Sequence, residues 1–198
     1  MRLAIAVPCH VYVAPQMAQS LSAMSYRLGQ LGYEVALRFL GNASSTFGRN
    51  ELVRWAKRIK ADYLLWVDTD SVFPPDAVER LLYSGYPFVG ANFSMKQKDG
   101  ESSCSDLVGN RLAPQPDGIQ RVSELGMGLT LMRMDVLDAV GEPWFALIDG
   151  ALDGPNDDGR FCRLATAAGF GPRVDHRLSS ECSHVGFTEY RLPIPVEA

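Results

Sequence analysis

The stretch YLLWVDTDSVFPPDAVERLL, residues 63–82, joins an apolar run to two aspartates and then to a helical pattern that opens with prolines. The apolar run has the length of a buried strand. Proline suits the first turn of a helix, where the missing N–H would have no partner in any case. The stretch therefore predicts a strand that ends at Asp68 and Asp70, followed by a helix that begins near Pro75.

Strand and helix patterns alternate on both sides of this stretch as far as residue 93. Continuous apolar or β-rich runs predict strands, and apolar residues at helical spacing predict the helices between them. The expected strands are 3–7, 33–40, 62–67 and 86–93, and the expected helices are 16–31, 49–60 and 75–84, with a loop over 41–48. This alternation favours an α/β fold with a doubly wound, mostly parallel sheet and helices on both faces.

The second half of the chain is less regular. Residues 96–120 are polar and rich in Gly, Pro, Ser and Asp, and a loop of this length inside a compact domain is usually functional or disordered. We weigh two interpretations, a segment that closes over a bound substrate and a passive surface insertion. Two short strands are expected around Gly126 and Gly128, then helices over 135–140 and 157–169. We expect one domain over 1–198 with an elaborated carboxyl-terminal half.

Composition places the chain among ordinary globular proteins. Of its 198 residues, 46% are hydrophobic and 21% are charged. A net charge of -4 provides no basic face for nucleic acid or for an anionic membrane. No apolar stretch reaches the roughly 18 residues of a membrane span, and the apolar run 3–7 is short for a signal peptide. We therefore expect a cytoplasmic protein without a transmembrane segment or a nucleic-acid partner.

The four cysteines show neither CxxC nor zinc-ligand spacing. They are Cys9, Cys104, Cys162 and Cys182. A chain of this size does not need disulfides to supplement its core, so we interpret them as free thiols in a reducing compartment.

Asp68 and Asp70 are candidates for binding a cation. In an extended chain their side chains project to the same side, at the strand end where open α/β sheets bind ligands. Two carboxylates held this close repel each other unless a cation lies between them, and hard oxygen ligands suit Mg²⁺ or Mn²⁺. Such an ion could bridge nucleotide phosphates and neutralise a departing diphosphate. Alternatively, Asp70 and Ser71 merely cap the following helix.

Several motifs, in this order, resemble the nucleotide-sugar-dependent glycosyltransferases of the GT-A fold, especially family-2-like enzymes. The motifs are a helix opening with Arg49 and Asn50, the strand ending in Asp68 and Asp70, GMGLTLMRMDVL at 126–137, DDGRFCRLATAAGF at 157–170 and SHVG at 183–186. The resemblance implies a Rossmann-like GT-A domain. Its nucleotide-binding half would span about 1–95 and its acceptor and catalytic half about 121–190.

The resemblance also implies an activity and a donor site. The activity is the hexosyltransferase type, in which a sugar passes from a nucleoside-diphosphate sugar to a hydroxyl of a glycan, small-molecule or protein acceptor. Asp68 and Asp70 would bind the nucleotide and the Mn²⁺ or Mg²⁺ ion, and His184 would be a third metal ligand. The other interpretation of His184 is a histidine packed near Phe187.

Three further residues of the donor site follow from the same resemblance. Arg49 would face the diphosphate, where its guanidinium matches phosphate oxygens. The alternative is an ordinary charge in the first turn of a helix. Pro8 and His10, with Tyr12 nearby, would line the nucleobase pocket at the end of the first strand.

Asp158, with Asp157 as second choice, occupies the position of the catalytic base in this resemblance. An inverting transfer needs a carboxylate that takes the acceptor proton while the metal holds the leaving nucleoside diphosphate. The opposing consideration is that acidic residues are favoured in a first helical turn without any chemistry.

Two other function classes stay open. A sugar-phosphate nucleotidyltransferase would need a Gly-rich, basic loop after the first strand, where this chain reads PCHVYVAP at 8–15. A non-catalytic carbohydrate-binding module of GT-A type is favoured if Asp157 and Asp158 lie far from the metal site.

Overall fold

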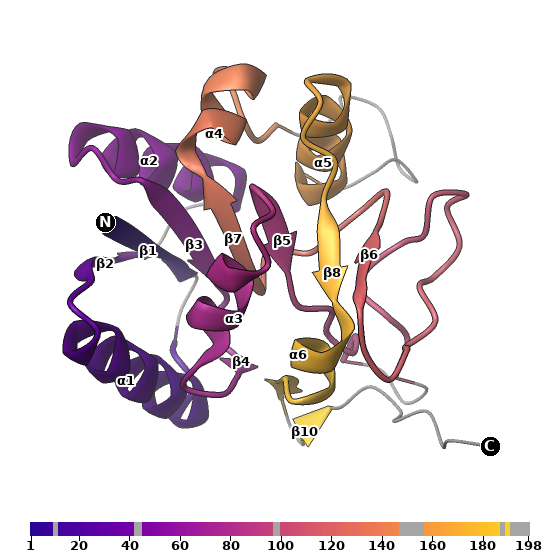
Figure 1. Ribbon diagram of the computed structural model, residues 1–198, viewed down its shortest axis with the longest axis horizontal. Helices are drawn as coiled ribbons and strands as arrows, with labels where there is room; N and C mark the ends of the chain where they lie inside the picture. The colour runs from indigo at the N-terminus through magenta and orange to yellow at the C-terminus, as the bar shows by residue number, and fades with distance from the viewer. Residues whose placement is uncertain (10–11, 42–44, 97–99, 147–156, 187–188, 191–198) are drawn as a thin grey trace.

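A seven-stranded mixed sheet with helices on both faces forms the centre of the protein (Figure 1). The structure is a computed structural model, and it describes residues 1–9, 12–41, 45–96, 100–146, 157–186 and 189–190. The strands of this sheet are β1 (Arg2–Cys9), β2 (Glu34–Gly41), β3 (Tyr63–Val67), β5 (Phe88–Gly90), β6 (Ile119–Arg121), β7 (Leu129–Arg133) and β8 (Arg173–Asp175). The α/β fold class is therefore confirmed.

The strand order is β2-β1-β3-β7-β5-β8-β6. The pairs β1/β2, β1/β3 and β5/β8 are parallel. In contrast, β7 runs antiparallel to both of its neighbours, and β6 is antiparallel to β8. The expected parallel arrangement thus holds for the first three strands, and the sheet as a whole is mixed because β7 enters between β3 and β5 in the opposite direction.

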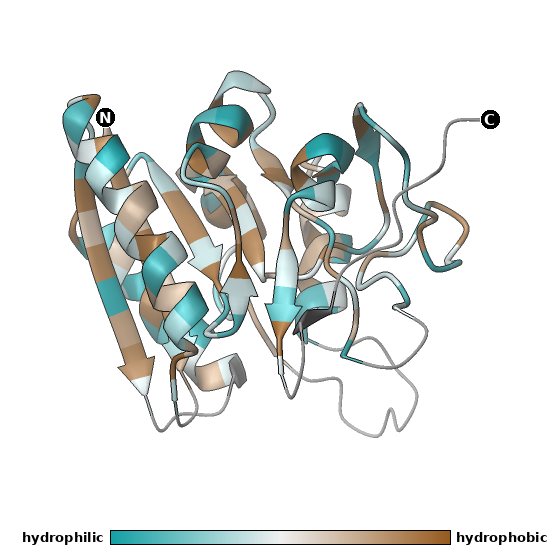
Figure 2. Cartoon of the chain, turned by 90° about the horizontal axis from the view of Figure 1, so that it is seen from below, coloured by the Kyte–Doolittle hydropathy of each residue, from teal (hydrophilic) through white to brown (hydrophobic). Residues whose placement is uncertain are grey.

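β3 is apolar along its whole length because helices cover both faces of the sheet. Its residues Leu64 to Val67 are fully buried. Leu64 and Trp66 face one apolar cluster, and Leu65 and Val67 face the other, as the alternation of side chains in a strand requires. Figure 2 shows the resulting layers, with apolar strands between helices that alternate polar and apolar bands.

The helices divide between the two faces (Figure 1). α2 (Ser45–Arg58), α4 (Met134–Val140) and α5 (Asp157–Ala167) lie on one face, and α1 (Pro15–Gln30), α3 (Ala77–Tyr83) and α6 (His176–Ser180) lie on the other. α2 begins four residues earlier than expected, so part of the predicted loop 41–48 is its first turn. Within the described ranges, no helix has both the length and the apolar character needed to cross a membrane.

A three-stranded sheet adds the elements that position the site. It consists of β10 (Glu189–Tyr190), β9 (Ser183–Val185) and β4 (Ser71–Val72). β4 and β9 are antiparallel, with Ser71 opposite His184. The Val185 N–H also donates to the Asp70 carbonyl oxygen at 2.8 Å. A residue near the carboxyl terminus is thereby fixed beside the end of β3.

The polar segment after β5 is built onto the body of the protein at several points. Ser94 bridges to Ser102, and Ser105 bridges to both Arg111 and Glu124. These contacts belong to the described part of the segment, which begins again at Gly100. The choice between a closing segment and a passive insertion stays a prediction.

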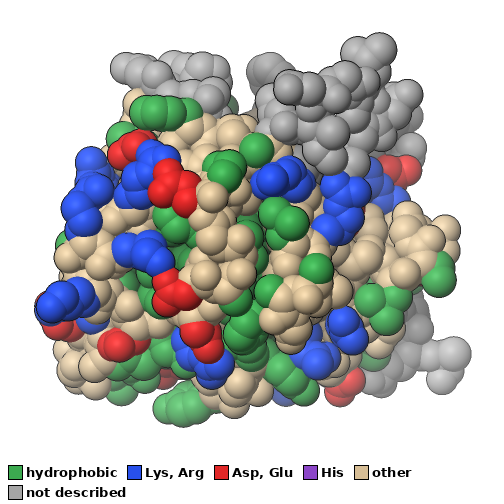
Figure 3. Space-filling view, turned by 90° about the horizontal axis from the view of Figure 1, so that it is seen from above, with side chains coloured by type: hydrophobic (Ala, Val, Ile, Leu, Met, Phe, Trp, Pro, Cys, Tyr) green, Lys and Arg blue, Asp and Glu red, His purple; other side chains and the backbone are tan. Residues whose placement is uncertain are grey.

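Charges of both signs are mixed on the face that Figure 3 shows. Ion pairs join α2 to the region of α4: Arg54 contacts Glu142, and Lys57 contacts Asp138. None of the four cysteines, all of which are described, forms a disulfide. Burial raises the pKa of the Cys104 thiol to about 12, so this side chain is a neutral core residue at physiological pH.

Gly90 lies where β5 and β7 pair most closely, and it offers a test of this packing. A Cβ at Gly90 would overlap Thr130 Oγ1 and would lie 2.7 Å from the Leu129 carbonyl oxygen. We expect Gly90→Ala to lower the free energy of unfolding by about 1–3 kcal/mol. Gly29→Ala is the matched control, because a Cβ there meets nothing within 4 Å. In α1 it should stabilise by roughly 0.5–1 kcal/mol. Denaturant unfolding measures both, and a Gly90→Ala protein as stable as wild type would contradict the packing described.

Candidate functional site

A pocket of about 190 Å³ opens at the carboxyl end of β3. Asp68, Asp158 and His184 line it together with Phe93 and Arg111. β3 and β5 run in the same direction, so the segments that follow them meet at one edge of the sheet. The structure therefore brings together residues that the sequence analysis selected from three distant segments.

Backbone hydrogen bonds fix the turn that carries the two aspartates. The Asp68 N–H donates to the Gly128 carbonyl at 3.1 Å, and the Thr69 carbonyl accepts from the Ala14 N–H at 2.8 Å. With the Val185 bond to Asp70, the turn is tied to the start of β7, to the start of α1 and to β9. α3 begins only at Ala77, so Asp70 does not cap it, and that alternative is excluded.

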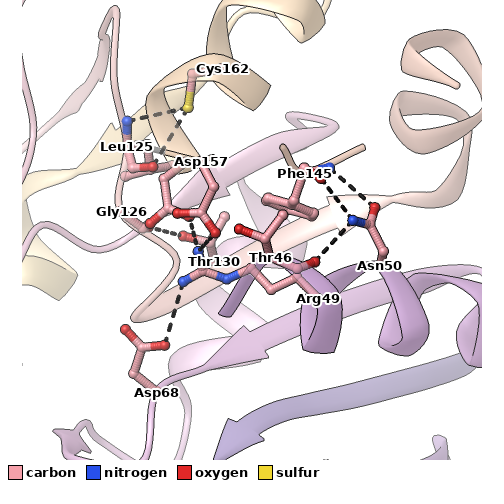
Figure 4. Close-up of polar contacts among 11 residues, drawn as sticks. Thr46, Arg49, Asn50, Asp68, Leu125, Gly126, Thr130, Phe145, Asp157 and Cys162 are labelled. Atoms are coloured by element: carbon pink, nitrogen blue, oxygen red, sulfur yellow. Dashed lines mark hydrogen bonds and ion pairs between the residues drawn. The ribbon is translucent and has the colours of Figure 1, made fainter. Parts of the chain in front are cut away.

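The Arg49 guanidinium lies among three carboxylates, of which Figure 4 labels Asp68 and Asp157. Its Nη1 is 2.8 Å from Asp157 Oδ2 and also contacts Asp158 Oδ1, and its Nη2 is 3.9 Å from Asp68 Oδ1. Arg49 is only 7% exposed, and it packs over the Phe145 ring. In this arrangement Arg49 faces acids, and its predicted contact with a diphosphate stays a prediction. One guanidinium thus compensates the charges of three carboxyl groups.

Asp158 and Asp68 both have raised pKa values. Burial raises the pKa of its carboxyl to about 7, Arg49 opposes the rise, and the carboxylates of Asp157 and Asp68 add to it. Desolvation likewise raises the pKa of Asp68, which Arg49 opposes and Asp70 increases. A carboxyl group that titrates near neutral pH is suited to exchange protons with a hydroxyl group.

His184 presents one ring nitrogen to Asp70. Its Nδ1 lies 2.9 Å from the Ser94 carbonyl oxygen. A carbonyl oxygen only accepts, so Nδ1 carries the hydrogen, and the neutral ring has its lone pair on Nε2. Nε2 is 4.0 Å from Asp70 Oδ1, which is too far for a hydrogen bond. The Phe93 ring stacks on the imidazole at 4.6 Å between centroids and fixes its plane.

The same geometry bears on metal binding. A histidine that donates Nδ1–H to a backbone carbonyl and directs Nε2 at a carboxylate has the arrangement of a metal-binding histidine. Among the described residues, no three His, Cys, Asp or Glu side chains gather closely enough to hold an ion by themselves. Mg²⁺, however, is commonly held by one or two carboxylates together with substrate phosphates. The pair of Asp70 and His184 fits such a site.

Of the two residues predicted to line the nucleobase pocket, the structure describes only Pro8. Pro8 lies half-buried at the end of β1, and it is not among the described residues that line the pocket. His10 lies outside the described residues, as does Phe187, the predicted packing partner of His184. Tyr12 is exposed. The nucleobase assignment of Pro8 and His10 stays a prediction.

Two contributing residues were not assigned a role from the sequence. The Lys96 ammonium contacts Asp70 Oδ2, yet in the sequence Lys96 is one charge in a polar segment without periodicity. Asn50 forms two hydrogen bonds with the Phe145 backbone: its Nδ2 donates to the carbonyl at 2.7 Å, and its Oδ1 accepts from the N–H at 3.2 Å. Asn50 thereby fixes the chain beside Arg49 (Figure 4). In the sequence, the only indication of a role for Asn50 was its place directly after Arg49 in the motif that resembles the GT-A enzymes.

A second, more open cavity of about 640 Å³ lies among α3, β8, α6 and the end of the polar segment. Asp117 and Ile119 of that segment line it, opposite Asp175 and Arg177. The polar segment therefore contributes to both cavities, since Ser103 and Arg111 line the first one.

Comparisons with known proteins place the fold. No protein-family model matches the chain, and no curated protein sequence matches it. Among solved structures, A197 from STIV is 17% identical, covers 94% of this chain and 86% of its own, and superposes with a TM-score of 0.66. A glycosyltransferase involved in the glycosylation of the major capsid of PBCV-1 is 12% identical and covers 71% of this chain and 68% of its own. Its TM-score of 0.35 is too low to carry an argument. The chain thus shares its overall fold with A197.

The raised pKa of Asp158 makes stability depend on pH in a defined direction. Between about pH 4 and about pH 7, the folded protein binds a proton that the unfolded chain has released, so wild-type stability falls as pH rises. We expect Asp158→Asn to remove this slope. The variant should gain stability relative to wild type across the window, by an amount on the order of a few kcal/mol. Denaturant unfolding at several pH values measures the gain, and a difference that stays constant with pH would contradict the raised pKa.

Proposed function

We propose that the protein is an inverting glycosyltransferase that moves a sugar from a nucleoside-diphosphate sugar to an acceptor hydroxyl. The observation that carries the proposal is the position of Asp158. Its carboxyl, with a pKa of about 7, lines the same pocket as Asp68 and His184. The motif order in the sequence supports the same class, and the transfer would be of the hexosyltransferase type.

In the proposed reaction Asp158 is the general base. Its ionised carboxylate takes the proton of the acceptor hydroxyl while the oxygen forms a bond to the anomeric carbon. The bond between that carbon and the diphosphate oxygen breaks, and its electron pair leaves with the nucleoside diphosphate. Attack from the face opposite the leaving group inverts the configuration, so an α-linked donor gives a β-linked product.

Arg49 and Asp157 support this base. The guanidinium contacts both Asp157 and Asp158, which limits the directions in which the Asp158 carboxyl can turn. It also keeps part of the Asp158 population ionised despite burial. We assign Asp157 mainly to holding Arg49, and Asp158 to the proton transfer.

The proposed donor side consists of Asp68 and His184, which line the pocket, and of Asp70, which faces His184. We propose that Asp70 and His184 hold a Mn²⁺ or Mg²⁺ ion, which when bound neutralises charge on the departing diphosphate. The 4.0 Å separation between His184 Nε2 and Asp70 Oδ1 supports this assignment, because two acceptors face each other there. Asp68, nearer to Arg49, would contact the nucleotide.

The alternatives receive less support. A sugar-phosphate nucleotidyltransferase would need a basic, Gly-rich loop after β1, and the sequence PCHVYVAP at 8–15 contains neither Gly nor Lys nor Arg. A non-catalytic carbohydrate-binding module is favoured by a large separation between the acids of α5 and those after β3. Arg49 contacts Asp158 and lies 3.9 Å from Asp68, so this separation is small. For the acceptor, the candidate region is the part of the polar segment that lines the pocket with Asp158, namely Ser103 and Arg111.

Asp158→Asn tests the proposed base. Incubation with a panel of nucleotide sugars and Mn²⁺ first identifies the donor from the release of nucleoside diphosphate. The variant should then bind donor as wild type does, while sugar transfer falls roughly 10²–10⁴-fold. Asp157→Asn should be milder. Wild-type kcat/KM should rise with pH through about 7, because the base acts in its ionised form.

Two outcomes would overturn this assignment. One is an Asp158→Asn enzyme that turns over at the wild-type rate. The other is a product that keeps the donor configuration, which NMR of the anomeric coupling would reveal.

Asp70→Ala tests the cation site. We expect it to abolish Mn²⁺-dependent binding of nucleoside diphosphate while the protein remains folded, because the variant removes a carboxylate that holds the ion. Asp138→Ala, an exposed aspartate paired with Lys57, is the matched control and should bind as wild type does. Calorimetry measures the affinity, and an equal affinity with and without EDTA in the wild type would contradict metal dependence.

A further inference from the structure

We infer that Lys96 and a divalent cation compete for the Asp70 carboxylate. This inference rests on the proposed function, because it concerns the cation site of the donor pocket. Lys96 would act as an internal counter-cation that lowers the apparent affinity of the site for the ion.

The first observation is that the two oxygens of Asp70 have different partners. Oδ2 contacts the Lys96 ammonium, and Oδ1 faces His184 Nε2 at 4.0 Å. An ion held by Asp70 and His184 would bring a second positive charge next to Lys96. The repulsion between the two cations favours loss of one of them.

The second observation is that Lys96 can leave. The side chain of Lys96 is 38% exposed and that of Asp70 is 21% exposed, so water reaches the ion pair. Partly exposed ion pairs of this kind contribute little to stability, and a flexible lysine stem can carry its ammonium into solvent. Arg49, by contrast, is buried and paired with Asp157 and Asp158, so it cannot respond in this way.

The third observation is that the contacts that orient His184 do not involve the Lys96 side chain. Phe93 stacks on His184, and the Ser94 carbonyl accepts from His184 Nδ1. The Met95 N–H donates to the Glu101 carbonyl at 2.7 Å. Departure of the Lys96 ammonium therefore breaks none of these contacts, and we expect His184 to keep its orientation toward Asp70.

Competition has a measurable consequence. A ligand that must displace an internal group binds with an affinity reduced by the fraction of sites which that group occupies. Lys96→Met keeps an unbranched stem of similar length but removes the charge. We expect it to bind Mn²⁺ more tightly, on the order of tenfold. Lys96→Arg keeps the charge and adds a fork that matches a carboxylate, so it should bind Mn²⁺ as weakly as wild type or more weakly.

The experiment is a titration of the full chain with Mn²⁺ alone, in which electron paramagnetic resonance reports the free ion. The proteins are wild type, Lys96→Met, Lys96→Arg and Asp70→Ala. Lys57→Met is the matched control, because Lys57 forms a comparable ion pair with Asp138 further along α2 from Arg49. Circular dichroism confirms that each variant is folded. Tighter binding by Lys96→Met, with Lys57→Met unchanged, supports the competition.

The remaining outcomes separate this inference from the proposed function. Wild-type protein that binds Mn²⁺ through Asp70, together with equal or weaker binding by Lys96→Met, overturns the competition and leaves the cation site intact. Binding by Lys96→Met with none by wild type supports the competition in its strongest form. No binding by either protein, or binding that Asp70→Ala does not alter, overturns the competition. The assignment of the ion to Asp70 is then decided separately by the Mn²⁺-dependent binding of nucleoside diphosphate, because the site is proposed to hold the ion together with phosphates.

Discussion

The buried guanidinium of Arg49 is the interaction on which the candidate site depends. It contacts two acids at the start of α5, more than a hundred residues later in the chain, and its Nη2 lies 3.9 Å from Asp68 Oδ1 at the end of β3. Removing one member of a buried ion cluster leaves an uncompensated charge. Burial raises the pKa of Asp158 to about 7, and Arg49, which also faces Asp157 and Asp68, opposes only part of that rise. The proposed reactivity of this acid follows from its burial beside a guanidinium that it shares with two other carboxylates.

The site also requires that His184 be held beside Asp70, and two very short strands do this. β4 and β9 have two and three residues, yet their pairing places Ser71 opposite His184 and fixes the imidazole beside Asp70. Phe93, which follows β5, stacks on the imidazole ring. The large sheet brings the segments after β3 and β5 to one edge. The pairing of β4 with β9 and the stacking of Phe93 on His184 then set the distance between His184 and Asp70.

Much of the fold and part of the site could be predicted from the sequence. The fully apolar run before Asp68 predicted β3, since both faces of that strand are covered. Asp158 and His184 were selected by motif order, and both line the pocket with Asp68. The pairing of β4 with β9 could not be predicted, because two or three residues carry no periodic pattern. The direction of β7 was also missed, since an apolar run of five residues is the same in either direction. Lys96 gave no signal because its partner becomes its neighbour only in the folded chain.

The central position of β7 has a consequence for how the chain reaches its native state. β5 is the last strand of the first half of the sequence, and in the sheet it pairs only with β7 and β8, which lie about forty or more residues later. A nascent chain that ends near residue 95 therefore leaves β5 without a neighbour, and β3 with only one. Such non-local pairing requires long loops to close before the contacts that stabilise them form, which slows folding. The two halves of the sequence are thus synthesised one after the other but complete their sheet together.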